Sequence, residues 1–158
     1  MSQALETGQA APDFTLPIDN GEAVSLSALK GQNVVLFFYP KDLTSGCTKE
    51  SIAFSQLKGE FAAANTHIIG ISADSVARHA KFREKNDLTV DLASDEERAV
   101  IQAYGVWVEK SMYGRKYMGI ERATYLIDSE GRIARIWRKV RISGHVEQVL
   151  KAAQELNQ

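Results

Sequence analysis

The sequence predicts an α/β fold, with a mixed central β-sheet flanked by helices and extended by an N-terminal β-hairpin. Two apolar runs, 33–39 and 67–72, lack the alternation of half-exposed strands, which is typical of strands buried on both faces. Turn signals at 19–21 (DNG) and 129–131 (SEG) each separate two short strand-like segments. The chain therefore predicts two buried inner strands and a hairpin near each end.

The N-terminal half supplies the first hairpin and the central strand. Residues 13–16 and 23–26 favour short strands on either side of the first turn, and 33–39 is β-branched and aromatic. A helix then follows the PKDLTSGC segment. Its predicted core stripe recurs at i, i+3 and i+7 and consists of Phe54, Leu57 and Phe61.

The middle of the chain repeats the pattern of strand and helix. The predicted elements are a buried strand at 67–72, a polar helix capped by Asp74 or Ser75 and reaching about Lys85, a short strand at 90–93, and a helix capped by Ser94-Asp95 and ending near Tyr104-Gly105. Residues 108–115 (VEKSMYGR) are polar with one glycine, and this predicts a loop near the functional pocket.

The C-terminal part adds a second hairpin and a last helix. Residues 124–128 and 133–137 predict its strands, and the helix begins near Gly144-His145. The apolar positions of this helix are Val146, Val149, Leu150 and Ala153. Crossover connections make the inner strands parallel, and the final hairpin adds antiparallel strands. This order predicts a thioredoxin-like fold in one domain covering 1–158.

Composition excludes several classes of function. The 158 residues are 44% hydrophobic and 25% charged, with a net charge of -1, so no bulk charge attracts nucleic acid or an anionic membrane. The longest apolar run, 34–39, is too short for a membrane span. No basic segment followed by an apolar core opens the chain, which argues against a secretory signal. With one cysteine, these features predict a reducing, cytoplasmic compartment.

That single cysteine, Cys47, follows the central strand by a short turn. Such a turn brings its residues to the carboxyl edge of the sheet, where α/β proteins usually bind ligands. Cys47 then falls in the first turn of a helix, where free N–H groups and the helix dipole favour thiolate over thiol. Gly46 allows close backbone approach to a ligand. Without further information, an inert buried cysteine is the commoner alternative.

The pattern Pro40-x-x-x-Thr44-x-x-Cys47 resembles the active-site signature of the peroxiredoxins. Longer stretches, FFYPKDLTSGCTKES, RATYLIDSEGRIARIWRKV and GHVEQVL, resemble the bacterioferritin-comigratory (peroxiredoxin Q) branch, and the resemblance runs from about Pro12 to Leu150. It implies a peroxidase that reduces hydrogen peroxide and organic hydroperoxides without a metal or organic cofactor. Cys47 matches the peroxidatic cysteine and Arg122 the active-site arginine.

The chemistry of peroxide cleavage suits each matched residue. Cys47 would attack as a thiolate and become a sulfenic acid. Thr44 Oγ1 could hydrogen-bond the sulfur and the peroxide, and the backbone N–H of Gly46 or Cys47 could bind the second oxygen. Arg122 would keep the thiolate charged and polarise the peroxide. Pro40 would shield the sulfur from water.

The sequence departs from the family where a resolving cysteine is expected. In some members the resolving cysteine lies five residues after the peroxidatic cysteine, where this chain has Ile52. In others it lies on the helix that is predicted here to reach about Lys85, where this chain has Arg83. Residues five apart on a helix have Cα atoms roughly 8 to 9 Å apart, so members with that cysteine must unwind the helix to form the disulfide. Ile52 either packs toward the active-site loop or is exposed. The sequence predicts a one-cysteine cycle in which thioredoxin, glutaredoxin or a small thiol reduces Cys47. The family resemblance implies a monomer or weak dimer.

Several interpretations stay open. Glu50 either favours the helix start or orients an arginine. A non-enzymatic peroxide sensor or holdase remains the alternative function. A disulfide oxidoreductase is disfavoured, because Glu50 occupies the position where the second cysteine of a C-x-x-C motif would stand. No catalytic or metal-binding role is expected for the histidines, which are His67, His79 and His145. Core or pocket-wall positions are expected for Trp107, Tyr113, Tyr117 and Trp137.

Overall fold

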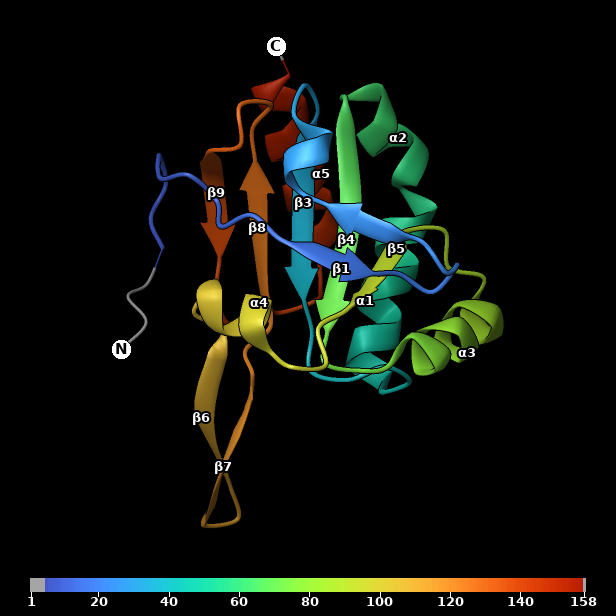
Figure 1. Ribbon diagram of the computed structural model, residues 1–158, viewed down its shortest axis with the longest axis vertical. Helices are drawn as coiled ribbons and strands as arrows, with labels where there is room; N and C mark the ends of the chain where they lie inside the picture. The colour runs from blue at the N-terminus through green and yellow to red at the C-terminus, as the bar shows by residue number, and fades with distance from the viewer. Residues whose placement is uncertain (1–4, 158) are drawn as a thin grey trace.

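The computed structural model describes residues 5–157 and contains a five-stranded mixed sheet in the order β5-β4-β3-β8-β9 (Figure 1). The parallel strands are β3 (Asn33–Phe38), β4 (Thr66–Ser72) and β5 (Asp91–Ser94). The antiparallel strands are β8 (Ala123–Ile127) and β9 (Ile133–Trp137), with β8 beside β3. The predicted mixed sheet and C-terminal hairpin are confirmed.

The central strand β3 is buried on both faces, as its composition predicted. Val34, Leu36 and Phe38 belong to one apolar cluster, and Val35 and Phe37 belong to the other. Successive side chains of a strand point to opposite faces, so each face of β3 needs apolar residues. This explains why the strand shows no polar–apolar alternation.

The first face of the sheet is covered by the N-terminal hairpin and one short helix, which cross in front of it in Figure 1. The hairpin consists of β1 (Thr15–Pro17) and β2 (Ala23–Ser25), and a short 3₁₀ turn, η1 (Ser27–Leu29), follows it. Gly21 has a φ of +88° in the turn, a conformation that glycine adopts without strain. The short helix α4 (Ala99–Ala103) adds the buried Ile101.

The second face is covered by the longer helices. These are α1 (Ser45–Gln56), α2 (Lys58–Ala63), α3 (Val76–Asn86) and α5 (His145–Leu156). Phe37 of β3 stacks on Phe54 of α1 with ring centroids 4.5 Å apart, and Phe61, Phe82 and Val149 complete the same cluster. Each such buried side chain contributes roughly 1.5–3 kcal/mol of transfer free energy.

Two predicted helices differ from the observed ones. The helix after Cys47 is divided at Leu57 into α1 and α2, yet Phe54 and Phe61 still pack together with centroids 5.8 Å apart. The helix expected directly after Asp95 begins only at Ala99, because Arg98 adopts a left-handed conformation with φ of 64°. Asp95 still caps it, since its carboxylate accepts the N–H of Ile101 at 2.7 Å.

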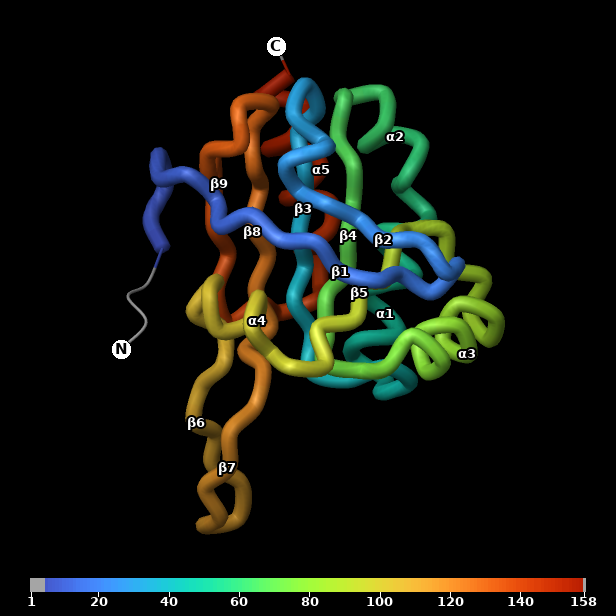
Figure 2. Tube along the Cα trace, in the orientation of Figure 1, coloured from blue at the N-terminus to red at the C-terminus, as the bar shows by residue number. Residues whose placement is uncertain are grey.

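The prediction of a loop at 108–115 is wrong. This segment belongs to a further hairpin, which the sequence did not predict and which consists of β6 (Trp107–Met112) and β7 (Arg115–Ile120). Tyr113 and Gly114 turn the chain with φ of 52° and 79°, as a type I′ turn requires. The hairpin extends away from the rest of the protein (Figure 2).

The position of this hairpin also corrects the placement of two aromatic residues. Tyr113 is 98% exposed and Tyr117 is 45% exposed, so neither lies in the core. Trp107 and Trp137 are half-buried, as expected. Arg98 lies over the Trp107 ring, with its guanidinium carbon 4.9 Å from the centroid.

None of the helices within residues 5–157 is long and apolar enough to cross a membrane. The expectations of one domain over 1–158 and of no secretory signal also concern residues 1–4 and 158, which lie outside the described residues.

Candidate active site

Cys47 lies in the first turn of α1, as predicted, and is only 1% exposed. Strand β3 ends at Phe38, and Thr44 takes the extended N-cap conformation with φ of -90° and ψ of 153°. The N–H of Thr48 donates to the Thr44 carbonyl at 2.9 Å and closes the first helical turn. The amides of Gly46 and Cys47 precede that bond and are therefore oriented to bind an anionic or polar ligand.

Arg122 brings a positive charge to the sulfur from the segment between β7 and β8. Its Nη2 donates to Cys47 Sγ at 3.1 Å, and its Nη1 donates to Glu50 Oε1 at 2.6 Å. One planar guanidinium thus bridges both side chains, which a lysine could not do with the same geometry. This arrangement places a positive charge directly beside the Cys47 sulfur.

Glu50 is the carboxylate that holds this arginine in place. It follows Cys47 by three residues on α1 and is fully buried. Its Oε2 has no hydrogen-bond partner within the described part of the chain. Burial raises the pKa of Glu50 from its ordinary 4.5 to about 7, although the charge of Arg122 opposes this shift. Of the two interpretations left open for Glu50, this geometry favours the orientation of an arginine.

We expect Glu50→Gln to change how stability depends on pH. Because the pKa of Glu50 is raised in the folded state, its contribution to stability is full below pH 4.5 and is lost as the pH rises through about 7. At about 1.4 kcal/mol per pKa unit, wild type should lose about 3 kcal/mol relative to the variant between pH 4.5 and 8. Chemical denaturation of both proteins across this range measures the difference.

The comparison with wild type cancels the titration of every other carboxylate, because both proteins carry the same remaining groups. A difference in unfolding free energy that stays constant from pH 4.5 to pH 8 would show that the pKa of Glu50 is not raised in the folded state.

Thr44 and Pro40 border the same turn. Thr44 is exposed, and its Oγ1 donates to the Lys41 carbonyl at 2.8 Å, whereas the sulfur takes its hydrogen bond from Arg122. The hydroxyl oxygen of Thr44 keeps free lone pairs that can accept from a peroxide O–H. Pro40 is half-buried directly after Tyr39 and offers no N–H.

A segment that the sequence did not assign to the site, 140–142, forms one wall of it. The N–H of Val140 donates to the Arg122 carbonyl at 3.1 Å. A Cβ at Gly46 would lie 3.3 Å from Arg122 Nη2 and 3.3 Å from Ile142 Cδ1. Gly46 therefore allows close packing of the helix start against this wall, whereas the close backbone approach to a ligand expected for it stays a prediction.

We expect Gly46→Ala to slow the oxidation of Cys47 by peroxide. The added methyl must displace the tip of Arg122 by a few tenths of an ångström, because the contact at 3.3 Å is tighter than ordinary packing. Displacements of this size cost about 3- to 10-fold in rate when geometry controls reaction. Stopped-flow measurement of the second-order rate constant tests this expectation. Gly59→Ala is the matched control, because a Cβ there meets nothing within 4 Å.

Two further titratable residues surround the site. His145 is buried at the start of α5, with Nε2 2.8 Å from Thr124 Oγ1. Burial, and then the charge of Arg122, lower the pKa of His145 to about 4, so it is neutral at neutral pH. Lys110 of β6 is half-buried, and burial and the charge of Arg122 lower its pKa. The charge of Arg122 therefore reaches a residue of the β6–β7 hairpin, which the sequence did not reveal.

The two residues at the family's resolving positions have structural contacts. Ile52 is half-buried and packs against the apolar cluster of the second face, so neither expected placement describes it fully. The guanidinium of Arg83 donates hydrogen bonds to both carboxylate oxygens of Asp19. It also donates to the carbonyls of Leu88 and Val90. It thereby connects α3 with the loop between β1 and β2.

No cluster of histidine, cysteine and acidic residues suited to a metal occurs among residues 5–157. A surface cavity of about 490 Å³ lies between β1 and the 94–103 segment and includes none of the predicted site residues.

Comparison with known proteins is consistent with this geometry. Residues 7–136 match the model of the AhpC/TSA family. The chain is 49% identical to a putative peroxiredoxin Bcp of Coxiella burnetii, over 93% of this chain and 97% of the relative. It is 46% identical to peroxiredoxin Bcp of Bacillus subtilis, over 98% of both chains.

Solved structures give the same result. The bacterioferritin comigratory protein of Xanthomonas campestris aligns with a TM-score of 0.90 and 40% identity, over 98% of each chain. A PrxQ C47S mutant of Xylella fastidiosa aligns with a TM-score of 0.92 and 34% identity, again over 98% of each chain. These neighbours share the thioredoxin-like arrangement that the sequence predicted.

Proposed function

Because the chain belongs to the AhpC/TSA family, in its Bcp peroxiredoxin branch, we propose that Cys47, Thr44, Arg122 and Pro40 carry out its reaction. The protein is a thiol-dependent peroxidase. The observation that carries the assignment of residues is the bridge made by Arg122, with Nη2 3.1 Å from Cys47 Sγ and Nη1 2.6 Å from Glu50 Oε1.

In the proposed reaction the Cys47 thiolate attacks one oxygen of the hydroperoxide, forming an S–O bond as the O–O bond breaks. Cys47 becomes a sulfenic acid, and the departing oxygen takes a proton and leaves as water or an alcohol. Arg122 stabilises the negative charge as it moves from sulfur to the departing oxygen. The amides of Gly46 and Cys47 and the hydroxyl of Thr44 orient the peroxide, while Pro40 excludes water.

Hydrogen peroxide and organic hydroperoxides are the proposed substrates. Alkyl peroxide reduction is described for the Xanthomonas protein, which is 40% identical to this chain.

An external thiol must return Cys47 to its reduced state, because the chain has one cysteine. The incoming thiolate attacks the sulfenic sulfur, water leaves, and a second thiolate then displaces the Cys47 thiolate from the mixed disulfide. We propose thioredoxin, glutaredoxin or a small thiol for this role, acting on a monomer or weak dimer. A reduced Cys47 also favours a cytoplasmic location.

A reductant screen tests the proposed cycle. Wild type should consume peroxide continuously with at least one of thioredoxin, glutaredoxin and dithiothreitol, because each can release the oxidised cysteine. A single turnover followed by arrest with all three would instead favour a peroxide sensor, the alternative that the lack of a second cysteine leaves open.

A further inference from the structure

We propose that a buried network of Tyr39, Asp42 and His79 positions the active-site loop for attack on the peroxide. The inference rests on the proposed function of Cys47. All three side chains are fully buried. They come from the residue after β3, from the loop that leads to α1, and from α3. The network thus joins the loop to two elements of the protein core.

Asp42 is held at every one of its polar atoms. Its Oδ1 accepts from the Tyr39 hydroxyl at 2.6 Å, and its Oδ2 lies 2.5 Å from His79 Nδ1. Its N–H donates to Asp74 Oδ2 at 2.8 Å, and its carbonyl accepts from Arg78 Nη2 at 3.3 Å. These bonds fix the position of Asp42, which lies in the sequence midway between Pro40 and Thr44.

The hydrogen bonds also define how many protons the pair holds. His79 Nε2 lies 3.0 Å from the Ala93 carbonyl, which can only accept, so this nitrogen carries a proton. One further proton must lie between Nδ1 and Asp42 Oδ2, because two bare lone pairs would repel at 2.5 Å. The pair thus has no net charge, which explains how both groups can be fully buried. Burial raises the pKa of Tyr39, so its hydroxyl remains a donor.

The loop needs such support because its backbone is strained. Leu43 follows Asp42 directly and has a φ of 66°, in the left-handed region that a leucine rarely adopts. Leu43 is 37% exposed, so its side chain is not anchored in the core. Strained residues of this kind persist when the surrounding structure fixes them. Without the network, Leu43 can relax, and Thr44 and the amides of Gly46 and Cys47 move with it.

The test measures the two half-reactions of Cys47 separately in His79→Gln. Oxidation by hydrogen peroxide should slow about 10-fold or more, because the peroxide-binding groups lose their alignment. Reduction of the sulfenate by dithiothreitol should stay within about two-fold of wild type or become faster, because it needs no such alignment. Circular dichroism must show that His79→Gln is folded, because unfolding would also slow oxidation while exposing the buried Cys47 sulfur to dithiothreitol.

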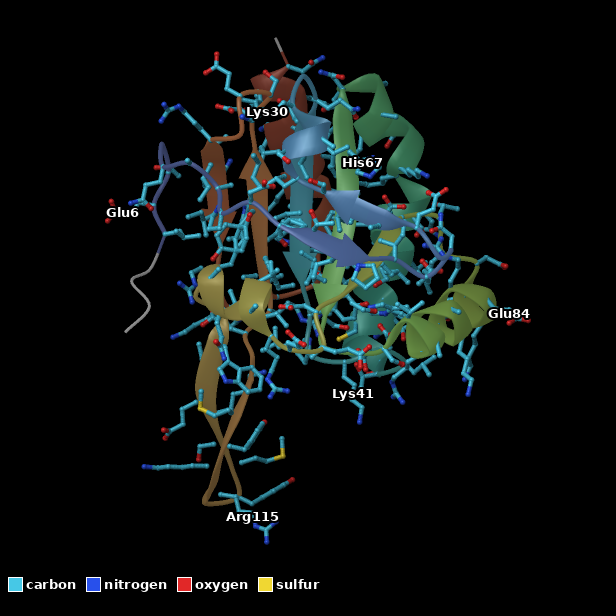
Figure 3. All side chains as sticks on the ribbon, viewed as in Figure 1. Glu6, Lys30, Lys41, His67, Glu84 and Arg115 are labelled. Carbon is cyan, nitrogen blue, oxygen red and sulfur yellow. The ribbon has the colours of Figure 1, made fainter. Side chains whose placement is uncertain are left out.

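His67→Gln is the matched control. His67 also pairs with an aspartate, with Nε2 2.7 Å from Asp91 Oδ2. It lies near the start of β4, at the opposite end of the strand from Ser72. Figure 3 shows His67 well separated from Lys41 of the active-site loop. This variant should leave both half-reactions unchanged.

Three results would overturn the inference: an oxidation rate in His79→Gln within two-fold of wild type, a proportional fall in both half-reactions, or the same slowing in His67→Gln. If His79→Gln does not fold, Tyr39→Phe decides, because it removes only the hydroxyl; it should slow oxidation several-fold, and an unchanged rate would refute the network. Should wild type itself fail to form a sulfenate, the proposed function fails, and not the network alone.

Discussion

Replacing Cys47 with serine is expected to reduce thiol-dependent peroxide consumption by at least about 10⁴-fold, because a hydroxyl is not ionised at neutral pH and is a far weaker nucleophile. The two side chains have nearly the same shape, and Cys47 packs beside Phe54 in the apolar cluster of the second face. The fold should therefore persist, as circular dichroism and thermal unfolding can establish.

Labelling with iodoacetamide provides the internal control for this variant. Cys47 is the only cysteine, so wild type should take up one label and Cys47→Ser none. Prior treatment of wild type with peroxide should block the label, and a reducing thiol should restore it. A folded Cys47→Ser protein that still consumes peroxide at a substantial fraction of the wild-type rate would refute the assigned nucleophile.

Arg122→Lys is expected to lower the rate of Cys47 oxidation by about 10²-fold or more, the usual cost of losing an aligned donor to a developing anion. Lysine keeps the positive charge but has no planar fork, so it cannot donate to Cys47 Sγ and Glu50 Oε1 in the observed geometry. The second-order rate constant with hydrogen peroxide measures the effect.

Arg138→Lys is the control for this substitution. Arg138 also pairs with a glutamate, with Nε 2.7 Å from Glu121 Oε2, but its side chain is 34% exposed. The same change of residue there should leave the rate within about two-fold of wild type, because exposed ion pairs contribute little. A rate for Arg122→Lys within about two-fold of wild type would mean that Arg122 acts only through its positive charge, and equal slowing in both variants would mean that the effect is not specific to Arg122.

The strands of the sheet could be predicted because their sequence pattern is local. Residues 33–39 are apolar at every position after Asn33, and this alone indicates a strand buried on both faces. The β6–β7 hairpin was missed for the opposite reason. Both of its faces are largely exposed, so its strands show no apolar alternation, and its turn is Tyr113-Gly114 rather than a common Asn-Gly pair.

The residues of the candidate site that match a known motif could be predicted from the sequence. The contacts between residues far apart in the chain could not. Cys47 and Arg122 followed from the signature and the family resemblance. The partner of Glu50 lies 72 residues away in the chain, so sequence spacing could not identify it. His79 was given no role, because its contact with Asp42 spans 37 residues and depends on how α3 packs against the active-site loop.

The most direct test is mass spectrometry of the intact protein after one equivalent of hydrogen peroxide, before and after addition of a thiol. The proposed cycle predicts one added oxygen on Cys47, then a mixed disulfide with the thiol, and finally the unmodified cysteine as more thiol is supplied. Peroxide consumption with Cys47 remaining an unmodified thiol throughout, in the absence of any reductant, would contradict it.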